Sequence, residues 1–190
     1  MVRTLLAGCS VVLTAFLGAL LPAAPANAAA LAPVLAGIHW GERSAELARH
    51  FGSRAIRLAR PIEFGDSYVD IALRNQLLGG FPFTVYFQMG KATHGLMRVM
   101  FERQRHGANP QVFRAVLETL SADYGPSVRS CDTPAAPGNG YQPVSERIWL
   151  DRNDIIRAVF MISHLYVQIG PLGRVADSCG DRHPSMHQKM

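Results

Sequence analysis

The chain has 190 residues, a formal net charge of +5, and 48% hydrophobic residues. This length suits one compact domain or two small halves, and the hydrophobic content is normal for a globular core. The positive charge is mild and no dense basic run is present, so the sequence gives no indication of nucleic-acid binding.

Residues 1–28 have the layout of a secretory signal peptide. A short basic start precedes an apolar run over residues 5–21, and Ala26-Asn27-Ala28 supplies small residues where signal peptidase reads them. We expect cleavage after Ala28 and a periplasmic or secreted protein without a stable membrane span. Leu6-Ala7-Gly8-Cys9 also resembles a bacterial lipobox, although most of the apolar run follows Cys9, so lipidation of Cys9 is the alternative.

The cysteines agree with an oxidising compartment. Two remain after removal of the signal peptide, Cys131 and Cys179, and their even number predicts a structural disulfide. Closing that loop would stabilise the fold by about 4 kcal/mol on the chain-entropy model. The alternative is two free thiols. Residues 171–190 lack periodicity and are predicted to be a tail tethered at Cys179.

The first half is predicted to be a helix followed by strands. Residues 29–33 are small and apolar and form a loose lead-in. Ser44 as a cap, Leu47 and Phe51 at i and i+4, and Gly52 as a stop predict a helix over 44–51. Alternation of apolar and polar residues then predicts strands over 55–60, 68–74, 81–89 and 97–101.

Residues 81–102 are predicted to be the central hairpin of the sheet. Phe81, Phe83, Val85, Phe87 and Met89 occupy every second position, which is the period of a half-buried strand. The apolar side of this hairpin and its neighbours should face the helices, and we expect the following residues there: Val69, Ile71, Leu73, Phe83, Val85, Phe87, Val99 and Phe101.

The second half repeats the order of a helix followed by strands. Asn109 as a cap, Pro110 at the first helical position and an apolar stripe predict a helix over 110–124 that ends at Gly125. Strands follow over 127–131, 146–150, 155–162 and 165–169, with a long exposed loop over 132–143. The predicted fold is therefore α+β, with two helices on a mainly antiparallel sheet in one domain over 29–170, divisible into similar halves 38–103 and 109–170.

An internal echo supports a comparison with known families. One helix ends in Leu47, Phe51 and Gly52, and the other ends in Leu120, Tyr124 and Gly125 at the same spacing. With Trp40-Gly41 before the first helix and Tyr124-Gly125-Pro126 after the second, the layout resembles small exported proteins of the beta-lactamase-inhibitor-like or outer-membrane-assembly-lipoprotein-like type. The resemblance implies an exported α+β protein and identifies no binding residue.

Motifs for catalysis are absent from the sequence, so we expect no enzyme and no cofactor. Serine hydrolase, zincin, P-loop and dinucleotide-binding signatures do not occur. Two carboxylate pairs, Glu63 with Asp66 and Asp151 with Asp154, lie in predicted turns where acidic residues are common. His183, Met186, His187 and Met190 could bind copper, but we expect an ordinary solvated tail and no metal site.

The polar face of the predicted sheet is the candidate binding surface. It should carry Tyr68, Arg74, Tyr86, Gln88 and Arg98, together with Asp70 and Met100, and Tyr, Arg and Met are favoured at protein interfaces. We therefore expect an exported, non-catalytic protein that binds or inhibits an envelope or secreted protein through this face. The alternatives are a small-ligand-binding or metal-binding envelope protein and, for the face itself, an ordinary solvated side of an antiparallel sheet.

Overall fold

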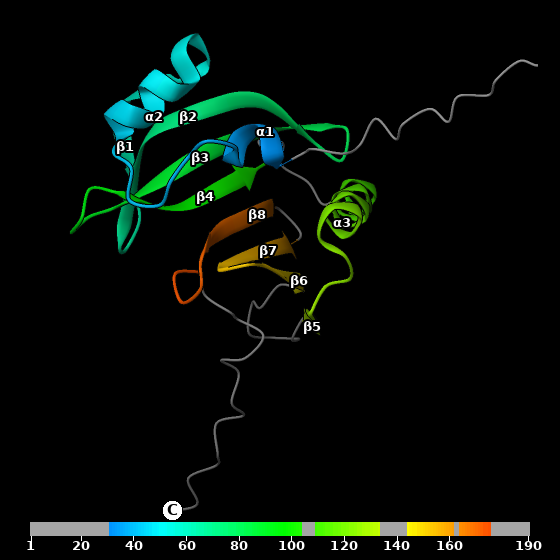
Figure 1. Cartoon of the computed structure of the whole chain (residues 1–190). Coiled ribbons are helices and arrows are strands. Elements are labelled where there is room, and N and C mark those ends of the chain that lie inside the picture. The colour runs from blue at the N-terminus through cyan, green and yellow to red at the C-terminus, as the bar shows by residue number, and fades with distance from the viewer. Residues whose placement is uncertain (1–30, 104–108, 134–143, 162–163, 176–190) are drawn as a thin grey trace, which may run out of the picture.

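A computed structural model describes residues 31–103, 109–133, 144–161 and 164–175 (Figure 1). These residues form an α+β fold with one antiparallel sheet of eight strands in the order β1-β2-β3-β4-β8-β7-β6-β5, which confirms the predicted fold class. The helices are α1 (Ala32–Leu35), α2 (Ser44–Phe51), the 3₁₀ turn η1 (Gly52–Arg54) and α3 (Pro110–Tyr124). The strands are β1 (Ile56–Glu63), β2 (Ser67–Leu78), β3 (Phe81–Gly90), β4 (Leu96–Glu102), β5 (Arg129–Thr133), β6 (Val144–Asp151), β7 (Asp154–Met161) and β8 (His164–Pro171).

Each half contributes a four-stranded meander to the same sheet and packs one helix of eight or more residues against it. The halves meet where β4 pairs with β8, with Val99 opposite Ile169 and Phe101 opposite Val167. In Figure 1, α2 packs on β2 in the first half, and α3 packs on β6 and β7 in the second. One sheet therefore runs through both predicted halves.

The core lies between the helices and one face of the sheet, which we call the helix face. Phe51 of α2 contacts Phe87 of β3 with ring centroids 5.1 Å apart, and Phe113 of α3 stacks on Phe160 of β7 at 5.2 Å. Phe83, Val85 and Phe87 are all buried in this core, as their alternation predicts. Burial of such large apolar side chains is the main source of stability available to the fold.

The two long helices begin differently. Asn109 caps α3 as predicted, since its Oδ1 accepts hydrogen bonds from the backbone N–H groups of Gln111 and Val112. The predicted cap at Ser44 is wrong. Ser44 is the first helical residue of α2, and its hydroxyl donates to Asp70 at 2.7 Å. The backbone N–H of Arg43, the residue before α2, is satisfied instead by the carboxylate of Glu46 at 2.8 Å.

Two segments predicted to be loose are packed. Leu31 within the lead-in and Val34 just after it are buried in the core around the short helix α1. At the start of the predicted tail, Val175 packs with Ile148 and Ile155 on the second face of the sheet, opposite the helix face. Apolar contacts made far along the chain order both segments, and local periodicity does not reveal such contacts.

β1 and β2 extend furthest beyond their predicted ends. β1 continues through Pro61 to Glu63, which an edge strand allows because one side of it needs no hydrogen-bond donor. β2 continues past Arg74 to Leu78, with a register shift at Asn75, which has φ 56°. Residues 134–143, Cys179 and the His/Met segment 183–190 lie outside the described residues, as does the signal peptide, so the predictions made for them stay predictions.

Candidate ligand-binding site

The residues predicted for the binding face do not all lie on one side of the sheet. A β-bulge in β2 turns the side chains that precede it to the opposite face. Tyr68 lies opposite Met89 and packs against the core, while Ala72 lies opposite Tyr86, and the register shifts between these two pairs. Tyr68 is therefore on the helix face, and its prediction as a residue of the open face is wrong. Its neighbour Val69 takes the second face, contrary to prediction, because an extra residue in one strand exchanges the two faces.

Asp70 also lies on the helix face, where it accepts the hydroxyl hydrogen bond of Ser44 from α2. The Tyr68 hydroxyl lies 3.2 Å from Nδ1 of His94 in the turn between β3 and β4. Burial, followed by the charge of Asp70, raises the pKa of Tyr68. Asp70 therefore links α2 to the sheet and Tyr68 contacts the β3–β4 turn, so neither residue is part of an open binding face.

Gln88 and Arg98 lie on the second face, but both are committed to contacts within the protein. Gln88 is 3% exposed and the Arg98 side chain is 13% exposed. Arg98 donates hydrogen bonds to Gln88 at 2.6 Å, to both carboxylate oxygens of Asp66 at 2.9 and 2.5 Å, and to Ser67 at 2.9 Å. The hydrogen bond from Arg98 is the main cause that lowers the pKa of Asp66.

The hydrogen-bonded polar side chains around Arg98 continue as a row across the second face of the sheet. Gln168 of β8 donates to Gln88 at 3.3 Å, and Gln168 lies opposite Arg157 of β7. Arg157 in turn forms two hydrogen bonds with Glu146 of β6, at 2.7 and 3.0 Å, and both side chains are buried. Buried charges require such partners, so the row is an internal network that holds neighbouring strands together.

Arg74 and Tyr86 are the predicted residues of this face that stay accessible. Tyr86 is half-buried opposite Met100 of β4, and Arg74 is exposed near the second bulge of β2. Of the five predicted residues, the structure thus brings Gln88 and Arg98 into contact and separates Tyr68 from the rest. Cys131 lies in β5, and because Cys179 is outside the described residues, their disulfide stays a prediction.

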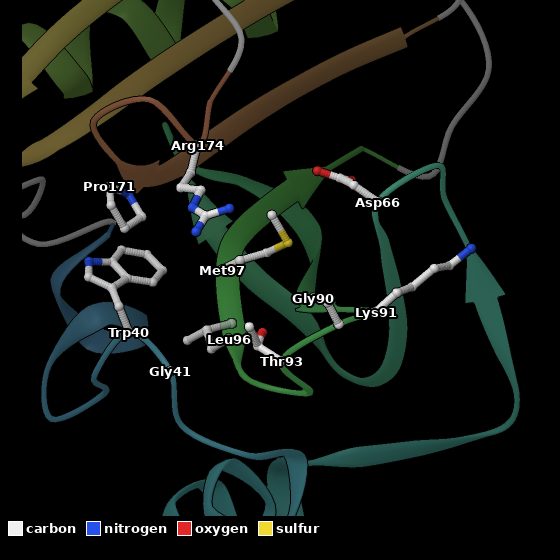
Figure 2. A pocket seen from close by; sticks show the side chains of 11 residues that line it. Trp40, Gly41, Asp66, Gly90, Lys91, Thr93, Leu96, Met97, Pro171 and Arg174 are labelled. Carbon is white, nitrogen blue, oxygen red and sulfur yellow. The ribbon is translucent and has the colours of Figure 1, made fainter.

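A cleft lies at one end of the sheet, beside Asp66 (Figure 2). It has a volume of about 430 Å³, within the usual range of small-molecule sites. Four separate segments line it: the turn before α2, the turn between β1 and β2, the turn between β3 and β4 with the start of β4, and the end of β8 with the residues after it. They contribute Trp40, Gly41, Asp66, Gly90, Lys91, Ala92, Thr93, Leu96, Met97, Pro171 and Arg174.

Backbone and side-chain hydrogen bonds fix Trp40 at the wall of the cleft. The N–H of Gly41 donates to the carbonyl of Leu96 at 2.8 Å, and the N–H of Leu96 donates to the carbonyl of Glu42 at 2.7 Å. The indole Nε1–H of Trp40 donates to Asp154 at 2.9 Å. Close approach requires glycine at position 95, because a Cβ there would lie 2.7 Å from the carbonyl oxygen of Gly41.

The turn between β3 and β4 forms another wall and is held equally firmly. Gly90 donates its N–H to the carbonyl of Gly95 at 2.9 Å, and His94 donates its N–H to the carbonyl of Gly90 at 2.8 Å. The N–H of Lys91 donates to the carbonyl of Asp66 at 3.0 Å, which joins this turn to the one between β1 and β2. The walls of the cleft are therefore preformed.

The charged groups around the cleft differ in how they are compensated. Lys91 forms an ion pair with Glu63 at 2.8 Å, and Asp66 pairs with Arg98. The side chain of Arg174 makes no hydrogen bond or ion pair within the described ranges. Figure 2 shows Trp40 and Pro171 at one end of the cleft, Lys91 at the other, and the guanidinium of Arg174 and the side chain of Met97 between them. The cleft thus combines an apolar wall with one uncompensated cation.

The carboxylate pairs considered from the sequence have other roles. Glu63 and Asp66 bind Lys91 and Arg98, and Asp154 accepts the indole hydrogen bond of Trp40. Within the described part of the chain, no group of three His, Cys, Asp or Glu side chains could hold a metal ion. In the same residues, no helix is long and apolar enough to cross a membrane.

Sequence reasoning missed this cleft, although two of its signals were visible. Trp40-Gly41 stood out as an aromatic residue followed by a turn, and Gly90 and Gly95 bracket the loop of the central hairpin. Nothing local indicates that these segments meet Pro171 and Arg174 from the other end of the chain. No protein-family model, curated protein or solved structure matches this chain, so the resemblance to small exported inhibitor-like or assembly-lipoprotein-like proteins stays a prediction.

Proposed function

We propose that this protein is an exported, non-catalytic binding protein whose small-molecule ligand occupies the cleft beside Trp40. The observation that carries the proposal is the preformed cleft of about 430 Å³, in which backbone hydrogen bonds tie three of the four wall segments together and the Arg98 side chain holds the fourth at Arg174. Rigid, mostly apolar concave sites with a few polar groups are typical of small-molecule binding. Export follows from the signal-peptide layout of residues 1–28.

Binding of a protein through the sheet face has less support. That function needs Gln88 and Arg98 to be free for a partner, whereas both are engaged in the internal network. Releasing Arg98 would leave Asp66 without its partner, at a cost that a new interface must offset. Tyr86 and Met100 stay accessible on this face and serve as its probes.

The engaged carboxylates favour binding over catalysis. A general acid or base must be within reach of a substrate proton. Asp66 lines the cleft, yet its two oxygens accept hydrogen bonds from the guanidinium of Arg98. We therefore propose that the cleft holds its ligand without transforming it.

A fragment screen by NMR on the mature chain from Ala29 tests this function. A panel of neutral and charged single-ring and double-ring aromatic compounds at millimolar concentration should include compounds that shift the indole N–H signal of Trp40. The signal of Trp149, which is 1% exposed in the core, should stay in place. The chain has two tryptophans, so the two indole signals are readily distinguished.

Two variants locate the binding. Ala92→Trp should abolish the Trp40 shifts, because Ala92 is an exposed residue of the cleft wall and a large side chain there fills the space. Tyr86→Ala, on the sheet face, should leave them unchanged. The proposal is wrong if no compound in the panel shifts the Trp40 signal, or if the shifts depend on Tyr86 and survive Ala92→Trp.

A further inference from the structure

We infer that the ligand of the cleft is an organic carboxylate, whose aromatic body contacts Trp40 and Met97 and whose carboxylate pairs with the guanidinium of Arg174. The inference rests on the proposed function and adds the chemical class of the ligand. Three features of the cleft carry it: the charge of Arg174, the way its backbone is held, and the composition of the opposite wall.

The charge balance favours an anion. Three ionic side chains line the cleft, and two of them have partners: Lys91 is paired with Glu63 and Asp66 with Arg98. Arg174 is exposed and has no such partner within the described ranges, so it leaves the cleft with an uncompensated positive charge. A planar guanidinium binds a carboxylate through two parallel hydrogen bonds, which no neutral ligand reproduces.

The backbone of Arg174 is fixed although its side chain is free. Its N–H donates to the carbonyl of Pro171 at 2.9 Å, and its carbonyl accepts a hydrogen bond from Arg98 at 3.0 Å. The buried network thus sets the point from which the guanidinium extends into the cleft. An anchor that is already positioned loses less freedom when a ligand binds.

The apolar wall suits a flat, unsaturated group. Trp40 and Met97 are half-buried and border the same cleft as Arg174, and Leu96 and Pro171 extend the apolar lining. Indole rings and methionine thioethers make favourable contacts with aromatic rings. A cationic aromatic ligand would contact the same wall, but it would be repelled by Arg174 and would find Asp66 already paired.

A matched pair of compounds tests the inference on the mature chain: 2-naphthoate and its neutral isostere 2-naphthamide. Calorimetric titration should show that 2-naphthoate binds about tenfold or more tightly than 2-naphthamide, because charge-assisted hydrogen bonds contribute more than neutral ones. Binding of 2-naphthoate should weaken at higher salt, since the pair is partly exposed. In NMR spectra both compounds should shift the Trp40 indole signal.

Arg174→Gln should remove the preference, lowering the affinity for 2-naphthoate about tenfold and changing that for 2-naphthamide less than twofold. Arg60→Gln, which removes an exposed arginine of the edge strand β1, is the matched control and should keep the preference. Thermal melting should show that both variants fold like the parent protein, since both side chains are exposed.

Equal binding of the two compounds, or an unchanged preference in Arg174→Gln, would overturn the carboxylate class while the small-molecule function stands. Tighter binding of the cationic isostere 2-naphthylmethylammonium would also overturn it. If neither naphthoate nor naphthamide shifts the Trp40 signal, the carboxylate inference is wrong, and the fragment panel then decides separately whether the cleft binds any small molecule.

Discussion

Arg98 connects several parts of this molecule through a single guanidinium. Its guanidinium bridges Asp66 and Ser67 at the β1–β2 turn to Gln88 of β3, and it also holds the carbonyl of Arg174 behind the cleft. The Arg98 side chain is mostly buried, so its bonds to Gln88 and Ser67 are partly shielded from water, whereas its bonds to Asp66 are exposed. Arg98 therefore contributes to the site as a positioning residue.

The ion pair of Arg98 and Asp66 makes the free energy of unfolding depend on pH in the acid range. The pKa of Asp66 lies below its ordinary value of 3.8, chiefly because of the Arg98 hydrogen bond. A lowered pKa in the folded state means that the stabilisation is present above about pH 4 and is lost as pH falls through the folded pKa. Asp66→Asn should reduce the free energy of unfolding at pH 7 by about 0.5–1 kcal/mol, a small value because the Asp66 side chain is 58% exposed.

Urea unfolding between pH 2.5 and 7 measures this effect. The difference between the parent protein and Asp66→Asn should shrink below pH 4, as Asp66 becomes protonated in both states of the parent. Glu118→Gln, on the exposed side of α3, is the control and should follow the parent profile. A constant difference across the whole pH range would contradict the assigned role of the ion pair.

Among the structural elements, α3 has the most clearly defined interactions at its two ends. Asn109 satisfies two backbone donors at its start, and Gly125, with φ 79°, ends it. The carbonyl of Gly125 then accepts the indole N–H of Trp149 at 2.9 Å, which ties the end of the helix to β6. The helix is thus positioned by its ends as well as by its apolar side.

Removing the cap should destabilise the fold by a predictable amount. Asn109→Ala should lower the free energy of unfolding by about 1 kcal/mol, because the N–H groups of Gln111 and Val112 lose their acceptor. Asn109→Ser keeps an acceptor at the cap and should cost only a fraction of that. Urea denaturation at pH 7 measures both, and equal losses in the two variants would show that capping is not the cause.

Considered whole, the molecule should unfold as one unit, because its sheet is continuous. β4 and β8 join the two meanders through buried residues such as Val99 and Val167, so neither half can open without exposing the other. Trp40 lies in the first half and donates its indole N–H to Asp154 of the second, while Trp149 lies within the second half. Trp40 is therefore a natural reporter for the junction of the halves and Trp149 for the second half.

Single-tryptophan variants test this cooperativity. In Trp149→Phe the fluorescence of Trp40 reports on the junction of the halves, and in Trp40→Phe that of Trp149 reports on the second half. Within each variant, the urea midpoint by fluorescence should coincide with the midpoint by far-UV circular dichroism, as two-state unfolding requires. Separate midpoints would indicate that the halves unfold independently.

The secondary structure was predictable because its signals are local. The stripe of α3, its cap at Asn109 and the alternation of Phe83, Val85 and Phe87 all appear in the expected places. The predictions were wrong where contacts between residues far apart in the sequence determine the local structure. α1 is ordered by burial of Leu31 and Val34, and Ser44 turns from its expected cap to Asp70.

The sequence by itself determined the α+β class, most of the strands and the apolar side of the central hairpin, because each follows from periodicity over a few residues. Only the tertiary structure decided which face Tyr68 takes, since a bulge is a relation between two strands. It also decided that Gln88 and Arg98 are internal and that Trp40, Met97 and Arg174 share a cleft. The physical reason is that burial and ion pairing depend on contacts between strands. Arg98 meets Gln88 and Asp66 through the pairing of β2, β3 and β4, and Arg174 reaches the cleft because β8 pairs with β4.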